Sequence, residues 1–415
     1  MKKLLIPFLL MGFVLGGPCY AVSSLADDLD SLRASGMQKV EQELFEDAIS
    51  DFSVVLESRP DDTLTLKLRA DAHFKVGNMF SAILDYDKLV STNAKDFQYF
   101  MLRARAKEAA GLEEEAIDDY AQALNLKPDL RDAYYQRGML YKMAGEYEYA
   151  LFDFKKCVKL KPSSELYFLT GYLESRLGRD MASLMYLQKA VDAEPNNLTY
   201  ALFRSRALNR LGKYSDALKG LNKALSKNKK NPELLVQRGL TLHYLRKYDK
   251  AIADFNVAEK IDSSLADIYL YRARTLVMTG EQRQAVEDYG KLIALKPDYM
   301  DAYLFRANIY LDMNSLHAAI ADLTAYNSLN QYNFSIYNKR AEAYLRLGLY
   351  EKAVEDFDQA LELFPEYGRA FYYRGQTWLF LEDPEQACED FFASLELGFS
   401  QVSNEFSPSL HSACK

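Results

Sequence analysis

The side chains that most often carry out catalysis are scattered along this chain. The four histidines, His73, His243, His317 and His411, stand singly. The sequence contains no nucleophile-and-base arrangement, no glycine-rich phosphate loop and no metal-ligand spacing. It therefore predicts a protein that is not an enzyme and that needs no metal or cofactor.

Three arginines indicate a different chemistry, the recognition of carboxylates. Arg176, Arg206 and Arg210 concentrate positive charge near the middle of the chain. Guanidinium groups bind carboxylates through paired, charge-assisted hydrogen bonds. We hypothesise that an acidic segment of a partner, or a C-terminal carboxylate, docks at these arginines. The elements that must position them follow from a pattern that runs through most of the chain.

That pattern is a repeat of about 34 residues over residues 29–401. The eighth position of each repeat is small, and alanine stands twelve residues later in every repeat except one, where Ser183 replaces it. Four residues further on, the position is large and apolar. The small column comprises Gly36, Ala70, Ala104, Gly138, Gly171, Ser205, Gly239, Ala273, Ala307, Ala341 and Gly375.

The period and the small, aromatic and proline columns resemble the tetratricopeptide repeat. The resemblance covers about nine-tenths of the chain and implies eleven repeats. It implies an all-α fold, a right-handed superhelical solenoid of antiparallel helix pairs. We divide the chain into a signal peptide over residues 1–21, the array over residues 29–401 and a C-terminal tail over residues 402–415.

The repeat that begins at Arg131 shows how one helix pair forms. Tyr134, Gly138 and Tyr141 recur at helical spacing, so they share one face of a first helix. Gly145 supplies the left-handed conformation that ends this helix. A second helix follows, and Pro162 stops it before the next repeat begins.

Arginine and aspartate form two further columns, which we interpret as ion pairs that tie the helices together. The arginines are Arg69, Arg103, Arg137, Arg204, Arg238, Arg272, Arg306, Arg340 and Arg374. The aspartates are Asp51, Asp85, Asp119, Asp153, Asp254, Asp288, Asp322, Asp356 and Asp390. The fifth repeat has Thr170 and Tyr186 instead, and the sixth has Gly220 in the aspartate column, so the two central repeats are the least regular.

The resemblance to tetratricopeptide repeats implies a concave surface, lined by the first helices, that binds peptides or partner proteins. Aromatic rings and arginines suit an extended peptide, although individual rings have the alternative of packing between neighbouring first helices. The carboxylate clamp of cytosolic co-chaperones needs a Lys and Asn set that this sequence lacks. The predicted groove residues are Tyr135, Phe168, Tyr172, Arg176, Phe203, Arg206, Asn209, Arg210, Tyr244, Tyr271, Arg274 and Phe305.

The N-terminus resembles a signal peptide, with Lys2 and Lys3, a mostly apolar stretch, and a cleavage site after Ala21. We therefore expect an exported protein, periplasmic or secreted. An endoplasmic reticulum lumen and a lipid anchor on Cys19 are the alternatives, although Pro18 departs from the usual lipobox. No other stretch approaches the roughly 20 apolar residues of a membrane span. A net charge of -8 argues against nucleic acid as a partner.

Two cysteines fall at the C-terminal end of the chain. Cys388 lies in the last repeat and Cys414 in the tail, so a disulfide between them is one outcome in an oxidising compartment. Cys157 is expected to be a buried thiol. Repeat arrays usually end in a polar capping unit. Here either the tail covers the last apolar face, or another subunit does by self-association.

These observations favour a non-enzymatic scaffold that binds peptide segments of partner proteins in its concave groove. The alternative is a chaperone-like module of a secretory lumen that binds unfolded clients. One stoichiometric partner would favour the scaffold, and promiscuous binding would favour the chaperone.

Overall fold

The computed structural model describes residues 19–399 and residue 414, with side chains from residue 28 onward. Every regular element in this part of the chain is an α-helix, and consecutive helices pack against each other in pairs. The chain divides into two compact units, residues 1–194 and residues 195–415. The predicted all-α array of antiparallel helix pairs is confirmed within each unit.

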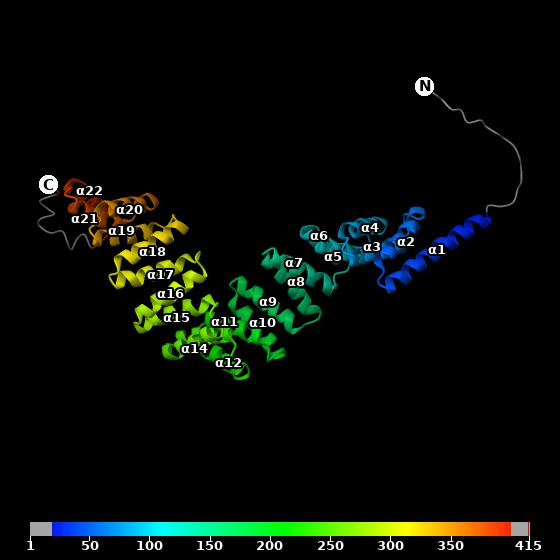
Figure 1. Ribbon diagram of the computed structural model, residues 1–415, viewed down its shortest axis with the longest axis horizontal. Helices are drawn as coiled ribbons and strands as arrows, with labels where there is room; N and C mark the ends of the chain where they lie inside the picture. The colour runs from blue at the N-terminus through cyan, green and yellow to red at the C-terminus, as the bar shows by residue number, and fades with distance from the viewer. Residues whose placement is uncertain (1–18, 400–413, 415) are drawn as a thin grey trace, which may run out of the picture. The chain divides into compact units, whose positions relative to one another are not determined.

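The first unit contains five helix pairs, coloured blue to green in Figure 1. Its helices are α1 (Cys19–Glu41), α2 (Phe45–Ser58), α3 (Thr63–Lys75), α4 (Met79–Thr92), α5 (Phe97–Ala109), α6 (Glu113–Leu126), α7 (Arg131–Met143), α8 (Tyr147–Leu160), α9 (Ser164–Arg176) and α10 (Asp180–Ala193).

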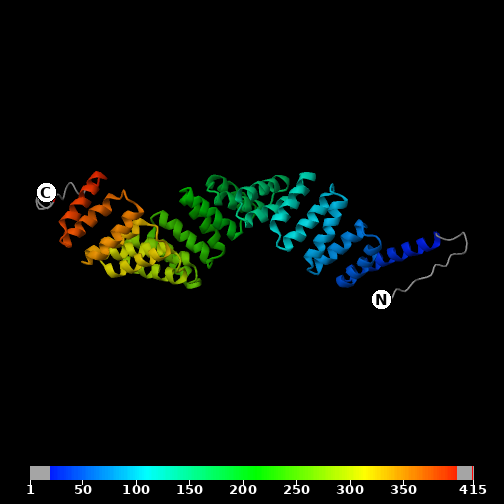
Figure 2. The same cartoon turned by 90° about the horizontal axis from the view of Figure 1, so that it is seen from above.

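The second unit contains six helix pairs, coloured green to red, and Figure 2 shows the same helices from above. They are α11 (Leu198–Arg210), α12 (Tyr214–Lys227), α13 (Pro232–Tyr244), α14 (Tyr248–Ile261), α15 (Ala266–Thr279), α16 (Gln282–Leu295), α17 (Met300–Asp312), α18 (Leu316–Leu329), α19 (Phe334–Arg346), α20 (Tyr350–Leu363), α21 (Gly368–Phe380) and α22 (Pro384–Glu396).

The odd-numbered helices are the first helices of the repeats. From the second repeat on, each begins at the residue that opens the repeat in the sequence, such as Thr63 and Arg131. The first repeat differs, because α1 begins at Cys19, well before Leu29. The turn between α7 and α8 contains Gly145 with φ +80°, as predicted.

The small column lets the two helices of a repeat approach closely. Phe255 and Ala251 of α14 are completely buried against α13, where Gly239 leaves room for the aromatic ring. A Cβ atom added to Gly239 would lie only 2.6 Å from Cε1 of Phe255. Each repeat therefore buries one large side chain beside a residue that has little or no side chain of its own.

The predicted Arg–Asp pairs are formed in eight repeats. In each, the Nε and Nη2 atoms of the arginine on the first helix donate to the two carboxylate oxygens of the aspartate on the second helix. Arg272 is the most buried of these arginines, and it also donates to Asn256 and Glu259. The fifth repeat uses a different pair, because buried Glu174 of α9 bonds Lys155 of α8 at 2.7 Å.

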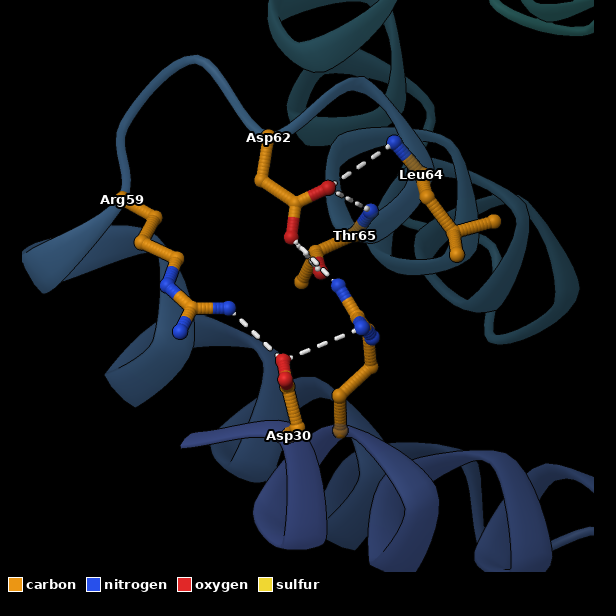
Figure 3. A network of polar contacts seen from close by, with 6 residues as sticks. Asp30, Arg59, Asp62, Leu64 and Thr65 are labelled. Carbon is orange, nitrogen blue, oxygen red and sulfur yellow. Dashed lines mark hydrogen bonds and ion pairs between the residues drawn. The ribbon is translucent and has the colours of Figure 1, made fainter. Parts of the chain in front are cut away.

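A polar network at the start of α3 connects the first two repeats (Figure 3). Asp62 caps α3 by accepting from the main-chain N–H groups of Leu64 and Thr65, at 3.2 and 3.3 Å. Its second oxygen accepts from Arg33 at 2.7 Å, and Asp30 accepts from Arg59 at 2.7 Å. Burial alone would raise the pKa of Asp62, but the bonds from Thr65 and Arg33 outweigh burial and lower it.

The structure decides between the outcomes that the sequence left open for the cysteines. Cys388 and Cys414, which are 26 positions apart in sequence, form a disulfide that joins α22 to the C-terminal end. Cys157 is a free, buried thiol, and burial raises its pKa to about 12. The rest of the predicted tail up to residue 413, and the predicted signal peptide up to residue 18, lie outside the described residues. Across the described part of the chain, no helix combines the length and apolarity of a membrane span.

Candidate peptide-binding groove

The first helices of the sixth, seventh and eighth repeats enclose a groove of about 610 Å³ in the second unit. We call it the α11–α15 groove, after the helices that supply most of its walls. Five predicted residues line it: Arg206, Asn209, Arg210, Tyr244 and Tyr271. Its other residues include Glu233, Val236, Gln237, Leu240, Asp267 and Lys296.

The floor of the groove is built from polar side chains that lie below the surface. Asn209 is 7% exposed and Gln237 is 5% exposed. The Asn209 amide donates to the hydroxyl of Thr241 at 2.9 Å, and that hydroxyl donates to the carbonyl of Gln237 at 2.8 Å. Asn209 is thus held in place, because its partner Thr241 is itself anchored to the backbone.

The side-chain nitrogen of Gln237 is different, because it has no hydrogen-bond partner among the described residues. A buried donor without a partner costs about 1–3 kcal/mol. This cost disappears when a ligand supplies an acceptor. The floor of the α11–α15 groove therefore includes a residue with a buried donor that lacks a partner.

Charged side chains surround this floor. Within the described part of the chain, Arg206, Glu233, Asp267 and Lys296 form no ion pairs. The arginines of the Arg–Asp pairs differ. Arg238 of α13 and Arg272 of α15 each bond an aspartate through two nitrogens. The groove therefore has positive and negative groups that other residues do not neutralise.

Aromatic rings provide the rest of the wall. Tyr244 is exposed and stacks on Tyr214 with 4.9 Å between the ring centroids. Burial raises the pKa of Tyr271, and Asp267 raises it further, so its hydroxyl stays protonated at neutral pH. A stacked ring and a neutral phenol offer apolar contact together with a hydrogen-bonding group.

His243 connects α13 and α15, two of the helices that form the groove. Its Nδ1 lies 3.0 Å from the hydroxyl of Thr275, which donates to the main-chain carbonyl of Tyr271. Burial lowers the pKa of His243, and the charge of Arg274 lowers it further. The imidazole is therefore neutral at pH 7 and links α13 to α15 beneath Tyr271.

Three predicted residues of the second unit, Phe203, Arg274 and Phe305, are not part of the groove lining. The guanidinium of Arg206 stands 5.1 Å from the ring of Phe203, and that of Arg274 stands 5.0 Å from the ring of Phe305. Phe305 also packs against the apolar core and lies 5.8 Å from the ring of Tyr289. Packing between helices, the alternative for such rings, is therefore what Phe305 does.

The remaining four predicted residues belong to the first unit. The Tyr135 hydroxyl donates to Glu165 at 2.8 Å, and the rings of Phe168 and Tyr172 lie 6.4 Å apart. Arg176 donates to the hydroxyl of Tyr147 at 3.3 Å and lies over its ring. Since Arg176 is in one unit and the other two arginines are in the other, a single cluster of all three stays a prediction.

Sequence reasoning missed nine residues of the groove lining, among them Glu233, Gln237, Asp267 and Lys296. The two carboxylates both occupy the second position of a first helix. That shared position was a usable signal. No comparable signal existed for Gln237, because its lack of a partner depends on the three-dimensional packing.

A second cavity, of about 360 Å³, lies in the first unit. Apolar residues form most of it, including Phe45, Phe74 and Leu102. Its carboxylate, Asp71, is already engaged, since it accepts from Tyr86 at 2.6 Å and from Lys67 at 2.7 Å. Among the residues that the structure describes, no three His, Cys, Asp or Glu side chains gather as a metal site would require.

Comparison with known families identifies the repeat. Models of the tetratricopeptide repeat match residues 132–164, 204–266 and 334–367. The first covers α7 and α8, the second spans the sixth and seventh repeats, and the third covers α19 and α20. The chain contains tetratricopeptide repeats, and the 22 helices of its described part correspond to about eleven of them.

Several solved structures are similar at low identity. A tetratricopeptide repeat protein from Parabacteroides merdae is 20% identical, with 60% of this chain and 99% of that chain covered, at a TM-score of 0.39. YrrB, described as a TPR protein with an unusual peptide-binding site, is 22% identical over 52% of this chain and 95% of its own, with a TM-score of 0.33. Yeast Tom70 is 15% identical over 94% and 96% of the two chains, with a TM-score of 0.38. A search of the curated proteins gives no match.

Proposed function

We propose that this protein is a non-enzymatic interaction scaffold that binds an extended peptide segment of a partner protein in the α11–α15 groove. The tetratricopeptide repeat is a protein-interaction architecture. The observation that carries the proposal is the composition of the groove: a buried unpartnered side-chain nitrogen, unpaired charges and two tyrosines, one exposed and one half-buried, around about 610 Å³.

A peptide is the ligand that this composition fits best. An extended chain presents main-chain carbonyls along its length, which the buried amide of Gln237 can bind, and side chains that can reach the charges and rings. These features favour a segment of polypeptide over a compact small molecule.

A specific observation also separates the scaffold from the chaperone-like alternative. Promiscuous binders use flexible, apolar or Met-rich surfaces that repack around different clients. Here the floor includes buried polar side chains, and Asn209 donates to Thr241, whose hydroxyl is anchored to the main-chain carbonyl of Gln237. A rigid polar floor selects among ligands, so we favour one partner over many.

The test is crosslinking and capture from native extracts with three forms of the full chain. These are the wild type, the variant Arg206→Glu/Arg210→Glu, and the control Lys250→Glu, whose exposed side chain lies on α14 outside the groove. We expect one dominant partner that the double variant loses and the control keeps. A broad client set that all three forms share would refute the proposal.

We also propose export, on the basis of the N-terminal signal-peptide pattern. Mass spectrometry of the protein from its native source should find a mature N-terminus at Val22. A mature chain that keeps Met1 or begins elsewhere in the leader would contradict this cleavage site, and a lipid on Cys19 would establish the alternative. Self-association at the C-terminal end stays a prediction.

A further inference from the structure

The charges of the α11–α15 groove are sorted by sign. Arg206 and Arg210 lie in the second half of α11, whereas Glu233 and Asp267 lie in the first turns of α13 and α15. Lys296, which follows α16, also lines the groove, so the charged lining residues outside α11 are two carboxylates and one ammonium. The groove thus has a positive end on α11 and a predominantly negative end on α13 and α15.

The unpartnered amide lies between these two ends. Gln237 stands four residues after Glu233 on α13, one helical turn further along the same face. By repeat position, it falls between the level of Glu233 and the level of Arg206. A ligand that reaches both charged ends therefore passes the level of Gln237, whose side-chain nitrogen is buried and lacks a partner.

The geometry of helices sets the spacing of the ligand's charges. Glu233 and Arg206 differ by seven positions within their repeats, which is about 10 Å along the helix axis at ~1.5 Å per residue. Neighbouring packed helices are about 8–10 Å apart. The two charges are then separated by roughly 14 Å, or about four residues of extended peptide at ~3.3 Å each.

We infer that the groove selects peptides by the order of their charged residues. An acidic residue of the peptide binds Arg206, and a basic residue about four positions away binds Glu233 and Asp267. A main-chain carbonyl between these two residues accepts a hydrogen bond from Gln237. This inference rests on the proposed function, because it specifies the peptide that the groove binds. The first-turn positions of Glu233 and Asp267 also suit the helix dipole. The experiment must therefore separate a binding role from a purely structural one.

The test uses a displayed library of random twelve-residue peptides and four forms of the full protein. On the wild type, we expect enrichment of peptides with opposite charges about four residues apart. The variant Glu233→Gln/Asp267→Asn should lose the preference for the basic residue and keep the acidic one. Arg206→Gln should do the reverse, and the control Lys250→Gln on α14 should keep both.

A selected peptide then tests the floor by fluorescence anisotropy. Gln237→Met removes the donor at similar length, and we expect its affinity for that peptide to fall about tenfold, as the loss of one buried hydrogen bond predicts. Circular dichroism at the working temperature shows whether each variant is folded. An unchanged affinity in folded Gln237→Met would remove this residue from the recognition scheme.

The two levels of the proposal fail in different ways. If the folded wild type enriches no peptide, the groove is not a peptide-binding site and the proposed function is wrong. If peptides are enriched without paired opposite charges, or if Glu233→Gln/Asp267→Asn selects the same peptides as the wild type, the charge-order inference is overturned while peptide binding stands.

Discussion

Gly239 lies at the eighth position of the seventh repeat, where an added methyl group would meet the ring of Phe255. The Cβ atom of an alanine there would be 2.6 Å from Cε1 and 2.8 Å from Cζ of a ring that is completely buried. Overpacking of this kind costs about 1–3 kcal/mol. Alanine gains about 1 kcal/mol over glycine in a helix. Because the contact is so short, we expect a net loss of about 2 kcal/mol for Gly239→Ala.

Gly290, in the middle of α16 of the next repeat, is the matched comparison. Its added Cβ atom would have one near neighbour, Nη1 of Arg306 at 3.4 Å. Arg306 holds Asp322 through Nε and Nη2, so Nη1 can move without breaking that ion pair. The gain in helix propensity therefore dominates, and Gly290→Ala should stabilise the protein by up to about 1 kcal/mol.

Thermal unfolding followed by circular dichroism distinguishes the two variants. For a folding unit of 150–250 residues, 1 kcal/mol shifts the melting temperature by about 2–4 °C. Gly239→Ala should then melt about 4–8 °C below the wild type, and Gly290→Ala up to about 4 °C above it. A Gly239→Ala protein that melts at or above the wild type would show that Phe255 gives way, and would refute the packing argument for the small column.

Three further predictions concern other parts of the chain. Reducing the Cys388 disulfide, which spans 26 residues, should destabilise the last repeat by at most about 3.5 kcal/mol; the fluorescence of Trp378, the single tryptophan, reports this unfolding. Asp288→Ala should cost about 3 kcal/mol, since it removes a partner of buried Arg272, and chemical denaturation measures the loss. Burial depresses the pKa of His243 below 6.5, so the folded state binds its proton less readily than the unfolded state. The stabilising contribution of neutral His243 is complete above pH 6.5 and is lost as the pH falls. The difference between the melting temperatures at pH 7.5 and pH 5.5 should therefore be smaller for His243→Gln than for the wild type.

Each of these three predictions has its own control or contradicting outcome. A Trp378 transition that does not respond to a reductant would mean that the disulfide leaves the last repeat unaffected. Asp254→Ala should cost less than Asp288→Ala, because Arg238 is more exposed than Arg272 and keeps solvent contact when its partner is removed. If His243→Gln has the same pH dependence as the wild type, the acid sensitivity arises elsewhere.

The fold could be predicted from the sequence because every part of it depends on local spacing. The small, aromatic and Arg–Asp columns recur within single repeats, so each helix pair is specified by its own residues. The pair of Lys155 and Glu174 was not predicted, since it replaces the regular pair with residues from two different repeats. The early start of α1 at Cys19 also lies outside the repeat pattern.

The groove could be predicted only in part, for a related reason. Arg206, Asn209 and Tyr271 could each be selected from a single repeat, because the type of side chain at that position already suggests contact with a ligand. Glu233 and Asp267 acquire meaning only when neighbouring first helices are placed side by side. A site shared among three repeats is therefore less visible in sequence than the repeats that build it.

The arginines of this chain divide into two sets according to their place on the first helix. Arg272 bonds Asp288 of α16 through two nitrogens and Asn256 and Glu259 of α14 through the third, whereas Arg274, two residues later, is exposed and stands over Phe305. Two residues correspond to about 200° around an α-helix at ~3.6 residues per turn. The seventh position of a repeat therefore directs its guanidinium to the second helix, and the ninth directs it away. Because Arg206 occupies the ninth position, a ligand bound at it would leave the Arg–Asp pairs that stabilise the array intact.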